Sequence, residues 1–245
     1  MRRSKTATAV KYTFKALGLI LVFGTIGILL WRVFTAGNPK DMENLSVNDA
    51  LVEAWNEAEV EGRELTIYTP VMPDGSQITS VLGKNYSYFA VTHNVFIEEA
   101  NQVQVLFRYN NSTIRHLTED FGLAEMPARE EHLFDVTLVK TNDLTPNDTT
   151  DNTKVEALSF TRYTPNEGYL RDYSSLYSYY RYTFDGISVD DVTLGVFVDF
   201  FYVDAIDYNA EAYGTLCIYS NDCKWLPSSL TSADRAALGA WREEN

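Results

Sequence analysis

Oxygen-bearing side chains gather in one short segment that follows the most apolar stretch of the chain. They are Asp204, Asp207, Asn209 and Glu211. Calcium prefers oxygen ligands at such spacing, but an EF-hand loop requires a glycine where Ala212 stands. The segment is compatible with a calcium site and, more simply, with a solvated acidic turn. We expect no other metal and no organic cofactor.

The chain has two cysteines, Cys217 and Cys223, six residues apart. Asn221 and Asp222 between them are typical turn residues, which would place the two thiols on adjacent strands within reach of a disulfide. A buried thiol and a separate turn cysteine fit the same spacing. Zinc is not expected, because the cysteines form no C-x-x-C pair and no histidine lies near them.

Motifs of known catalytic sites are absent from the sequence. There is no G-x-S-x-G, H-E-x-x-H, G-x-x-x-x-G-K-[ST] or strand-linked G-x-G-x-x-G. The most specific enzymatic alternative is a sortase-like transpeptidase, in which Cys217 and His93 would be the reacting pair. Leu216 replaces the threonine that precedes the cysteine in sortases, and the next arginine is as distant as Arg235. We therefore expect a binding module rather than an enzyme, and a surface hydrolase or sortase-like enzyme is the weaker alternative.

Tyrosine is unusually frequent, with sixteen residues in the chain. Alternation along a strand places Tyr177 and Tyr179 on one face, and Tyr180, Tyr182 and Phe184 on the other. Exposed tyrosines offer rigid contact area with a polar tip to proteins or sugars. We therefore consider Tyr177 and Tyr179 as binding residues, with a covered sheet surface as the alternative.

A single carboxylate, Asp199, interrupts the apolar stretch Val192–Val203. The same alternation places it on the face of Phe197 and Phe201. An unpaired carboxylate there is costly, so Asp199 should be paired or protonated. We predict Arg181 as its partner, because the strand before is the nearest in sequence and sequential strands commonly pair. Asp199 is either a structural paired carboxylate or a functional acid in a binding site.

An uncharged segment near the N-terminus predicts a membrane anchor. Ala16–Trp31 spans sixteen residues without a charge, or about 24 Å as a helix, and Val33 and Phe34 extend it. A cleaved signal peptide is the alternative, but Arg32 follows the apolar run directly. The excess of positive charge before the helix places residues 1–15 in the cytoplasm and the rest outside the cell membrane.

A second helix is predicted between the anchor at 16–34 and the first strand, within a linker region at 35–62. Apolar residues recur at helical spacing between Ser46 and Glu61, and Ser46-x-x-Asp49 forms a weak capping box. The polar face of this helix is acidic, so we expect it to dock on its own domain rather than on lipid.

Residues 63–245 predict an acidic, β-rich extracytoplasmic domain. Its strands are expected at Glu64–Tyr68, Tyr86–Thr92, Gln102–Tyr109, Phe134–Lys140, Lys154–Thr164, Leu176–Phe184, Val192–Val203 and Tyr213–Ser220. Short peripheral helices are expected at Ser112–Phe121 and Ser232–Trp241. Eight strands separated by polar turns favour an antiparallel β-sandwich or barrel.

Charge is distributed unevenly along the chain. The formal net charge is −14, and removing the six cations up to Arg32 leaves −20 on the rest. Nucleic acid is therefore not expected as a partner.

The stretches RYNNSTI, TEDFGL, FDVTLV, YRYTFDGISVDD, GVFVDFFYVD and YGTLCIYS resemble uncharacterised single-pass membrane-anchored proteins of Gram-positive anaerobic bacteria. The resemblance implies a bacterial surface setting and no activity. We expect a module that binds protein or cell-envelope material, or alternatively an accessory subunit of a membrane complex.

Overall fold

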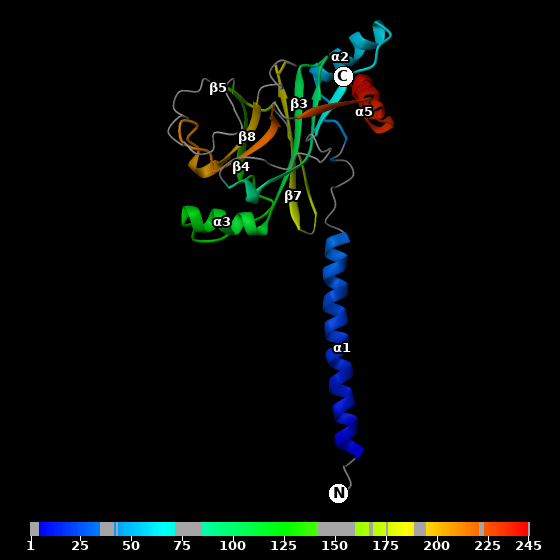
Figure 1. Cartoon of the computed structure of the whole chain (residues 1–245), viewed down its shortest axis with the longest axis vertical. Coiled ribbons are helices and arrows are strands. Elements are labelled where there is room, and N and C mark those ends of the chain that lie inside the picture. Colours follow the sequence, from blue (N-terminus) through cyan, green and yellow to red (C-terminus); the bar gives the residue numbers. More distant parts are fainter. Residues whose placement is uncertain are drawn as a thin grey trace.

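The computed structural model describes residues 5–34, 42, 44–71, 85–141, 160–166, 169–174, 176–188, 195–220 and 223–244. Within these residues the fold is mainly β, with two antiparallel sheets and four helices. The helices are α1 (Lys5–Phe34), α2 (Asp49–Val60), α3 (Asn111–Phe121) and α5 (Ser232–Glu244). The prediction of a mainly β fold with a long N-terminal helix is confirmed (Figure 1).

The larger sheet has six strands in the order β10-β1-β2-β3-β7-β6. They are β1 (Ile67–Val71), β2 (Ala90–Ile97), β3 (Gln102–Asn110), β6 (Leu170–Tyr173), β7 (Tyr177–Asp185) and β10 (Lys224–Ser228). The smaller sheet has the order β5-β4-β8-β9. Its strands are β4 (Phe134–Thr141), β5 (Phe160–Tyr163), β8 (Gly195–Tyr202) and β9 (Gly214–Ser220).

The sequence located most of these strands. β1 and β2 begin later than expected, because Glu64–Thr66 lies before the ladder and Tyr86–Tyr88 forms a short 3-10 helix. The short strands β6 and β10 were not predicted. Strand β8, which lies within the predicted strand Val192–Val203, is an inner strand that pairs with β4 and β9. Residues 154–159 and 192–194 of two predicted strands lie outside the described residues.

The two sheets share one hydrophobic core. Alternation along each strand sends every second side chain into it, for example Val105 and Phe107 from β3 and Val198 and Phe200 from β8. The rings of Phe107 and Phe200 meet edge to face, with centroids 4.8 Å apart, which is a favourable aromatic geometry. This contact joins the two sheets directly.

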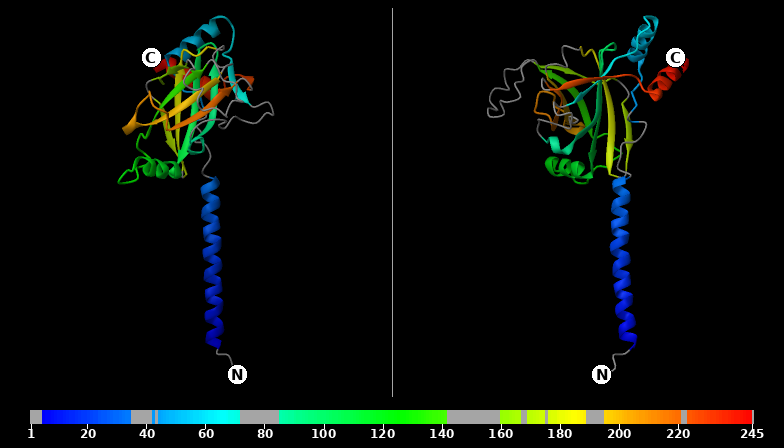
Figure 2. Two further views of the ribbon diagram at one scale, coloured as in Figure 1. Left: turned by 60° about the vertical axis from the view of Figure 1, so that its left-hand side comes forward. Right: turned by 45° about the vertical axis from the view of Figure 1, so that its right-hand side comes forward.

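A second apolar cluster covers the opposite face of the six-stranded sheet. Leu51 and Trp55 of α2 and Leu238 of α5 pack there against Ile67 and Val95. Both helices lie at the end of the β domain that is far from α1 (Figures 1 and 2). The predicted docking of the second helix on its own domain is therefore confirmed.

Side chains cap the helices on this face. Asn48, rather than Ser46, caps α2, because its Oδ1 accepts a hydrogen bond from Leu51 N at 3.1 Å. A capping box formed by Thr231 and Asp234 begins α5. Thr231 Oγ1 accepts a hydrogen bond from Asp234 N at 3.1 Å, and Asp234 Oδ2 accepts one from Thr231 N at 2.9 Å.

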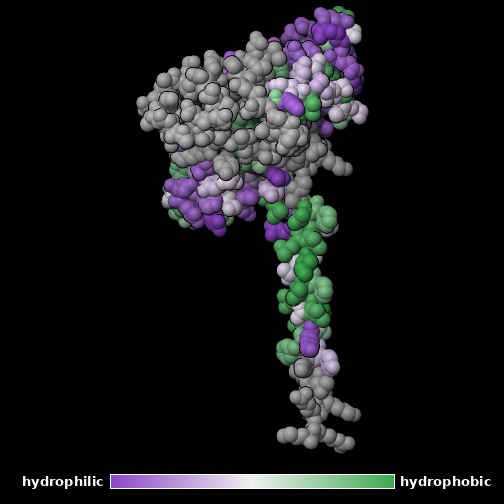
Figure 3. Space-filling view, viewed as in Figure 1, coloured by the Kyte–Doolittle hydropathy of each residue, from purple (hydrophilic) through white to green (hydrophobic). Residues whose placement is uncertain are grey.

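Helix α1 contributes little to either cluster. Its stretch Tyr12–Phe34 is long and apolar enough to cross a membrane, and none of its residues is buried against the rest of the chain. Figure 3 shows a largely hydrophobic surface along this helix.

Strand β10 forms one edge of the six-stranded sheet. Pro227 lies opposite Tyr68 of β1, and Lys224 lies opposite Val71. Proline is confined to edge strands because it has no N–H to donate to a ladder.

Candidate functional site

A row of polar side chains crosses the four-stranded sheet on the face turned away from the core. In the strand register Thr137 of β4 lies opposite Asp199 of β8, and Asp199 lies opposite Thr215 of β9. Their neighbours along each strand enter the core, so alternation directs these three to the other face. The predicted orientation of Asp199 is confirmed.

Asp199 is held by two partners. Thr215 Oγ1 donates a hydrogen bond to Asp199 Oδ1 at 2.7 Å, and Arg162 Nη1 of β5 lies 3.5 Å from Asp199 Oδ2. Arg162 Nη1 also donates to Thr137 Oγ1 at 2.7 Å. The four side chains are therefore connected in one chain of contacts across four strands. We call Arg162, Thr137, Asp199 and Thr215 the polar row.

Burial and pairing act in opposite directions on Asp199. Burial raises the pKa of this carboxyl above its ordinary value, while the hydrogen bond from Thr215 and the charge of Arg162 lower it. Burial is the largest of these influences. The carboxylate is therefore paired, yet its ionised form is less favourable than it would be in water.

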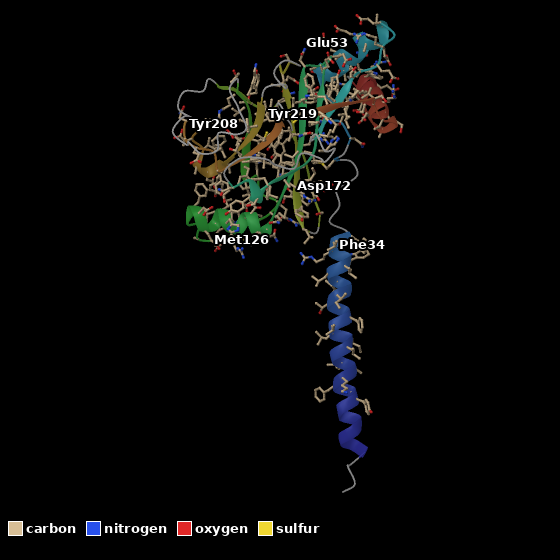
Figure 4. All side chains as sticks on the ribbon, viewed as in Figure 1. Phe34, Glu53, Met126, Asp172, Tyr208 and Tyr219 are labelled. Atoms are coloured by element: carbon tan, nitrogen blue, oxygen red, sulfur yellow. The ribbon has the colours of Figure 1, made fainter. Side chains whose placement is uncertain are left out.

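Aromatic side chains adjoin the polar row. The Arg162 guanidinium carbon lies 5.1 Å from the centre of the Phe201 ring, and the Tyr208 ring meets Phe201 edge on at 5.0 Å. Tyr208 Oη donates to Asp135 Oδ2 at 2.6 Å, and burial together with this carboxylate raises the pKa of Tyr208 to about 12. Tyr208 remains 40% exposed. It lies on the side of the β domain away from Glu53 of α2 (Figure 4).

The predicted partner of Asp199 is wrong. Arg181 lies on β7, which pairs with β3 and β6 in the other sheet. The chain changes sheets between β7 and β8, so these consecutive strands do not pair. Arg181 Nη2 instead donates to Met42 O at 2.5 Å, and Arg162 takes the place beside Asp199.

Tyr177 and Tyr179 do share a face of β7, but it is not an open one. Tyr179 is completely buried, in a small cluster with Met42 and Leu106. A buried side chain is not available to a ligand at the surface. Tyr179 therefore corresponds to the alternative interpretation, a covered sheet surface. Tyr177 is partly exposed, with the Arg108 guanidinium carbon 4.1 Å from its ring centre.

The four residues considered for calcium are exposed and serve local contacts. Asp204 Oδ2 accepts a hydrogen bond from Tyr202 Oη at 2.9 Å, and Asp207 Oδ1 accepts one from Asn209 N at 2.9 Å. Glu211 is exposed as well. Across the described residues no three acidic, histidine or cysteine side chains are grouped to hold a metal ion. The calcium site remains a prediction.

Cys217 and Cys223 are present as thiols. Cys217 is buried, and its Sγ donates to Tyr219 O at 3.2 Å. Burial raises the pKa of the Cys217 thiol to about 12. The turn residues 221 and 222 lie outside the described residues, and the disulfide stays a prediction.

Sequence reasoning missed four residues of the site: Thr137, Arg162, Tyr208 and Thr215. Arg162 lies in a predicted strand. It is distant in sequence from Leu138 and Val139 of β4, so no local pattern indicates that β5 pairs with β4 or that the Arg162 side chain reaches β8. Tyr208 lies in the acidic segment considered for calcium, where its aromatic ring was overlooked. The pairing of β4 with β5 brings Arg162 to the polar row.

Comparisons of the chain with protein families, with curated proteins and with solved structures find no match.

Proposed function

We propose that this chain is a single-pass membrane protein that displays a β-sandwich as a binding module outside the cell membrane. One observation carries the proposal: the stretch Tyr12–Phe34 of α1 is strongly apolar and buries no surface against its own chain. Exposing some 20 apolar residues to water is very unfavourable, and a bilayer removes that cost. The cations before the helix favour a cytoplasmic N-terminus.

The β domain has a composition suited to the outside of a cell. It is strongly acidic, which disfavours nucleic acid and anionic lipid surfaces as partners. A protein or a cell-envelope component remains as the class of ligand.

We place the binding surface at Tyr208 and Arg162. Tyr208 offers a partly exposed ring with a polar tip, and Arg162 offers a planar cation beside it. Asp199 acts as a positioning residue in this proposal, because its oxygens are engaged by Thr215 and Arg162. The contacts within the polar row hold the Arg162 guanidinium in one orientation for a ligand.

A sortase-like activity receives little support from the geometry. A nucleophilic cysteine needs a lowered pKa, whereas burial raises that of Cys217. His93 lies on β2, in the other sheet from Cys217, and its Nδ1 is 3.3 Å from Arg181 Nη2.

Topology can be tested with a C-terminal tag on the full-length chain in bacterial cells. We expect protease added to intact cells to remove the tag and to leave only the anchor region in the membrane. A tag that stays protected until the cells are lysed would overturn the proposed orientation.

Binding can be tested with the full-length chain in detergent and purified cell-wall fragments. We expect the chain to co-sediment with the fragments, and Tyr208→Ala and Arg162→Ala to weaken this at least fivefold. Leu226→Ala is the matched control, because Leu226 is exposed on β10 of the other sheet. Sedimentation that these substitutions leave unchanged would refute the assigned surface, and no sedimentation at all would refute a cell-wall ligand.

A further inference from the structure

The linker between α1 and α2 lies across the six-stranded sheet. Residues 42–48, all described except residue 43, are here called the linker strap. They contact the face of β3 and β7 that carries Gln102, Gln104 and Arg181, opposite to the face that enters the core between the sheets.

Gln104 recognises a peptide unit of the strap in both directions. Its Oε1 accepts a hydrogen bond from Ser46 N at 2.8 Å, and its Nε2 donates to Ser46 O at 2.8 Å. One amide side chain thus reproduces the pair of bonds that a neighbouring strand would make. This recognition reads main chain and is indifferent to the side chain at position 46.

Other side chains of the domain extend the same pattern along the strap. Arg181 donates from Nε and Nη2 to Met42 O at 3.1 and 2.5 Å. Asp234 of α5 accepts from Leu45 N at 2.8 Å, and Gln102 Nε2 donates to Asn48 Oδ1 at 3.0 Å. The strap is therefore held mostly through its backbone, by side chains from two strands and a helix.

The apolar contribution of the strap comes mainly from two buried side chains, and the partly buried Val47 packs against the cluster of α2 and α5 as well. Met42 and Leu45 are 3% and 7% exposed and enter two different clusters, Met42 with Tyr179 and Leu45 with Leu238. Their spacing of three residues gives a recognisable signature of the bound segment.

The covered face carries an unusual number of polar groups beside the apolar Leu106 and Tyr179. Gln102, Gln104 and Arg181 are each 0% exposed, and Arg181 is the largest side chain buried to this extent. Burying a guanidinium and two amides is unfavourable unless they are fully bonded, whereas water solvates them well. Hydration of these three groups offsets part of the cost of releasing the strap.

We propose that this face is a binding site for an extended peptide, which the chain's own linker strap occupies at rest. A competing segment would present main chain at the position of Ser46 and apolar side chains at the positions of Met42 and Leu45. Release of the strap would open the site to a competing segment. The proposal does not depend on what the surface around Tyr208 binds.

The site can be tested in the full-length chain in detergent. In an opened variant, residues 42–48 are replaced by glycine and serine in equal number, and a fluorescent peptide with the sequence MENLSVN is the probe. We expect the peptide to bind the opened variant at least tenfold more tightly than the unmodified chain. Adding Gln104→Ala to the opened variant should abolish this gain, while Thr161→Ala on the exposed side of β5 should not.

Failure to bind to an opened variant that retains its near-UV circular dichroism would overturn the proposal. An opened variant that does not fold would overturn it too, since the strap would then be an integral part of the domain. Hydrogen exchange on the unmodified chain gives a second measurement. The amide of Leu45 should exchange at least tenfold faster than the core amides of β3, and equal protection would contradict a releasable strap.

Discussion

Replacing Gln104 by alanine should detach the linker strap while leaving both sheets folded. The side chain is fully buried and bonds both the N–H and the carbonyl of Ser46. Alanine leaves these two strap groups without partners on a covered surface. Each unsatisfied group costs about 1–3 kcal/mol, so the strap should leave the sheet and bond water instead.

The expected size of the effect follows from the contacts of the strap. Burial of Met42 and Leu45 contributes about 3–6 kcal/mol in total. The six hydrogen bonds to the strap contribute about 1 kcal/mol each. Ordering seven residues of backbone costs about 7–14 kcal/mol. The gains and the cost are of similar size, so the strap is held by only a few kcal/mol. Losing about 2–3 kcal/mol should therefore shift the docking equilibrium at least 30-fold.

The Leu45 amide is the appropriate reporter. Its acceptor is Asp234, which the substitution leaves unchanged, whereas the Ser46 amide loses its acceptor directly. We expect hydrogen exchange at Leu45 to accelerate at least 30-fold in Gln104→Ala, with the amides of β8 unaffected. Thr161→Ala is the control and should change neither.

An exchange rate at Leu45 within threefold of the unmodified chain would refute this reasoning. It would mean that the apolar contacts alone hold the strap. A parallel acceleration at Leu45 and in β8 would also refute it, because the substitution would then unfold the whole domain.

Three further predictions concern the sheets. Because the pKa of Asp199 is raised by burial, the folded chain binds this proton more tightly than the unfolded chain, and stability falls as pH rises from 3.8 through the raised value. Asp199→Asn should remove that fall. In urea denaturation, the free energy of unfolding of the variant should therefore rise relative to that of the parent between pH 4 and 7. A difference that does not change with pH would contradict the raised pKa of Asp199. Tyr219→Phe removes a buried hydroxyl that has no hydrogen-bond partner among the described residues, so thermal denaturation should show unchanged or slightly raised stability. A loss above about 1 kcal/mol would contradict this and reveal a further partner. Mass spectrometry without reduction should find Cys217 and Cys223 linked after export, and two alkylated thiols would retire the disulfide.

Local patterns predicted what depends on a single strand or helix. The alternation around Asp199 gave its face correctly, and the spacing of Leu51, Trp55 and Ala58 gave the buried side of α2. Strand β10 escaped notice because it is short and contains Pro227, which weakens any strand pattern.

Pairing between distant segments could not be predicted in this way. Arg181 was assigned to Asp199 from order along the chain, but the path from β7 to β8 crosses from one sheet to the other. The burial of Tyr179 depends on Met42, more than 130 residues earlier in the sequence. Neither contact has a local signature.

The edge strand β10 has a consequence for a protein held on a surface. Copies anchored in one membrane share an orientation and meet at high two-dimensional concentration, so an open sheet edge would invite edge-to-edge pairing between neighbours. Pro227 offers no N–H to such a neighbour, and the exposed Lys224 would bring like charges together. On the proposed membrane anchor, this edge would therefore disfavour pairing between adjacent copies.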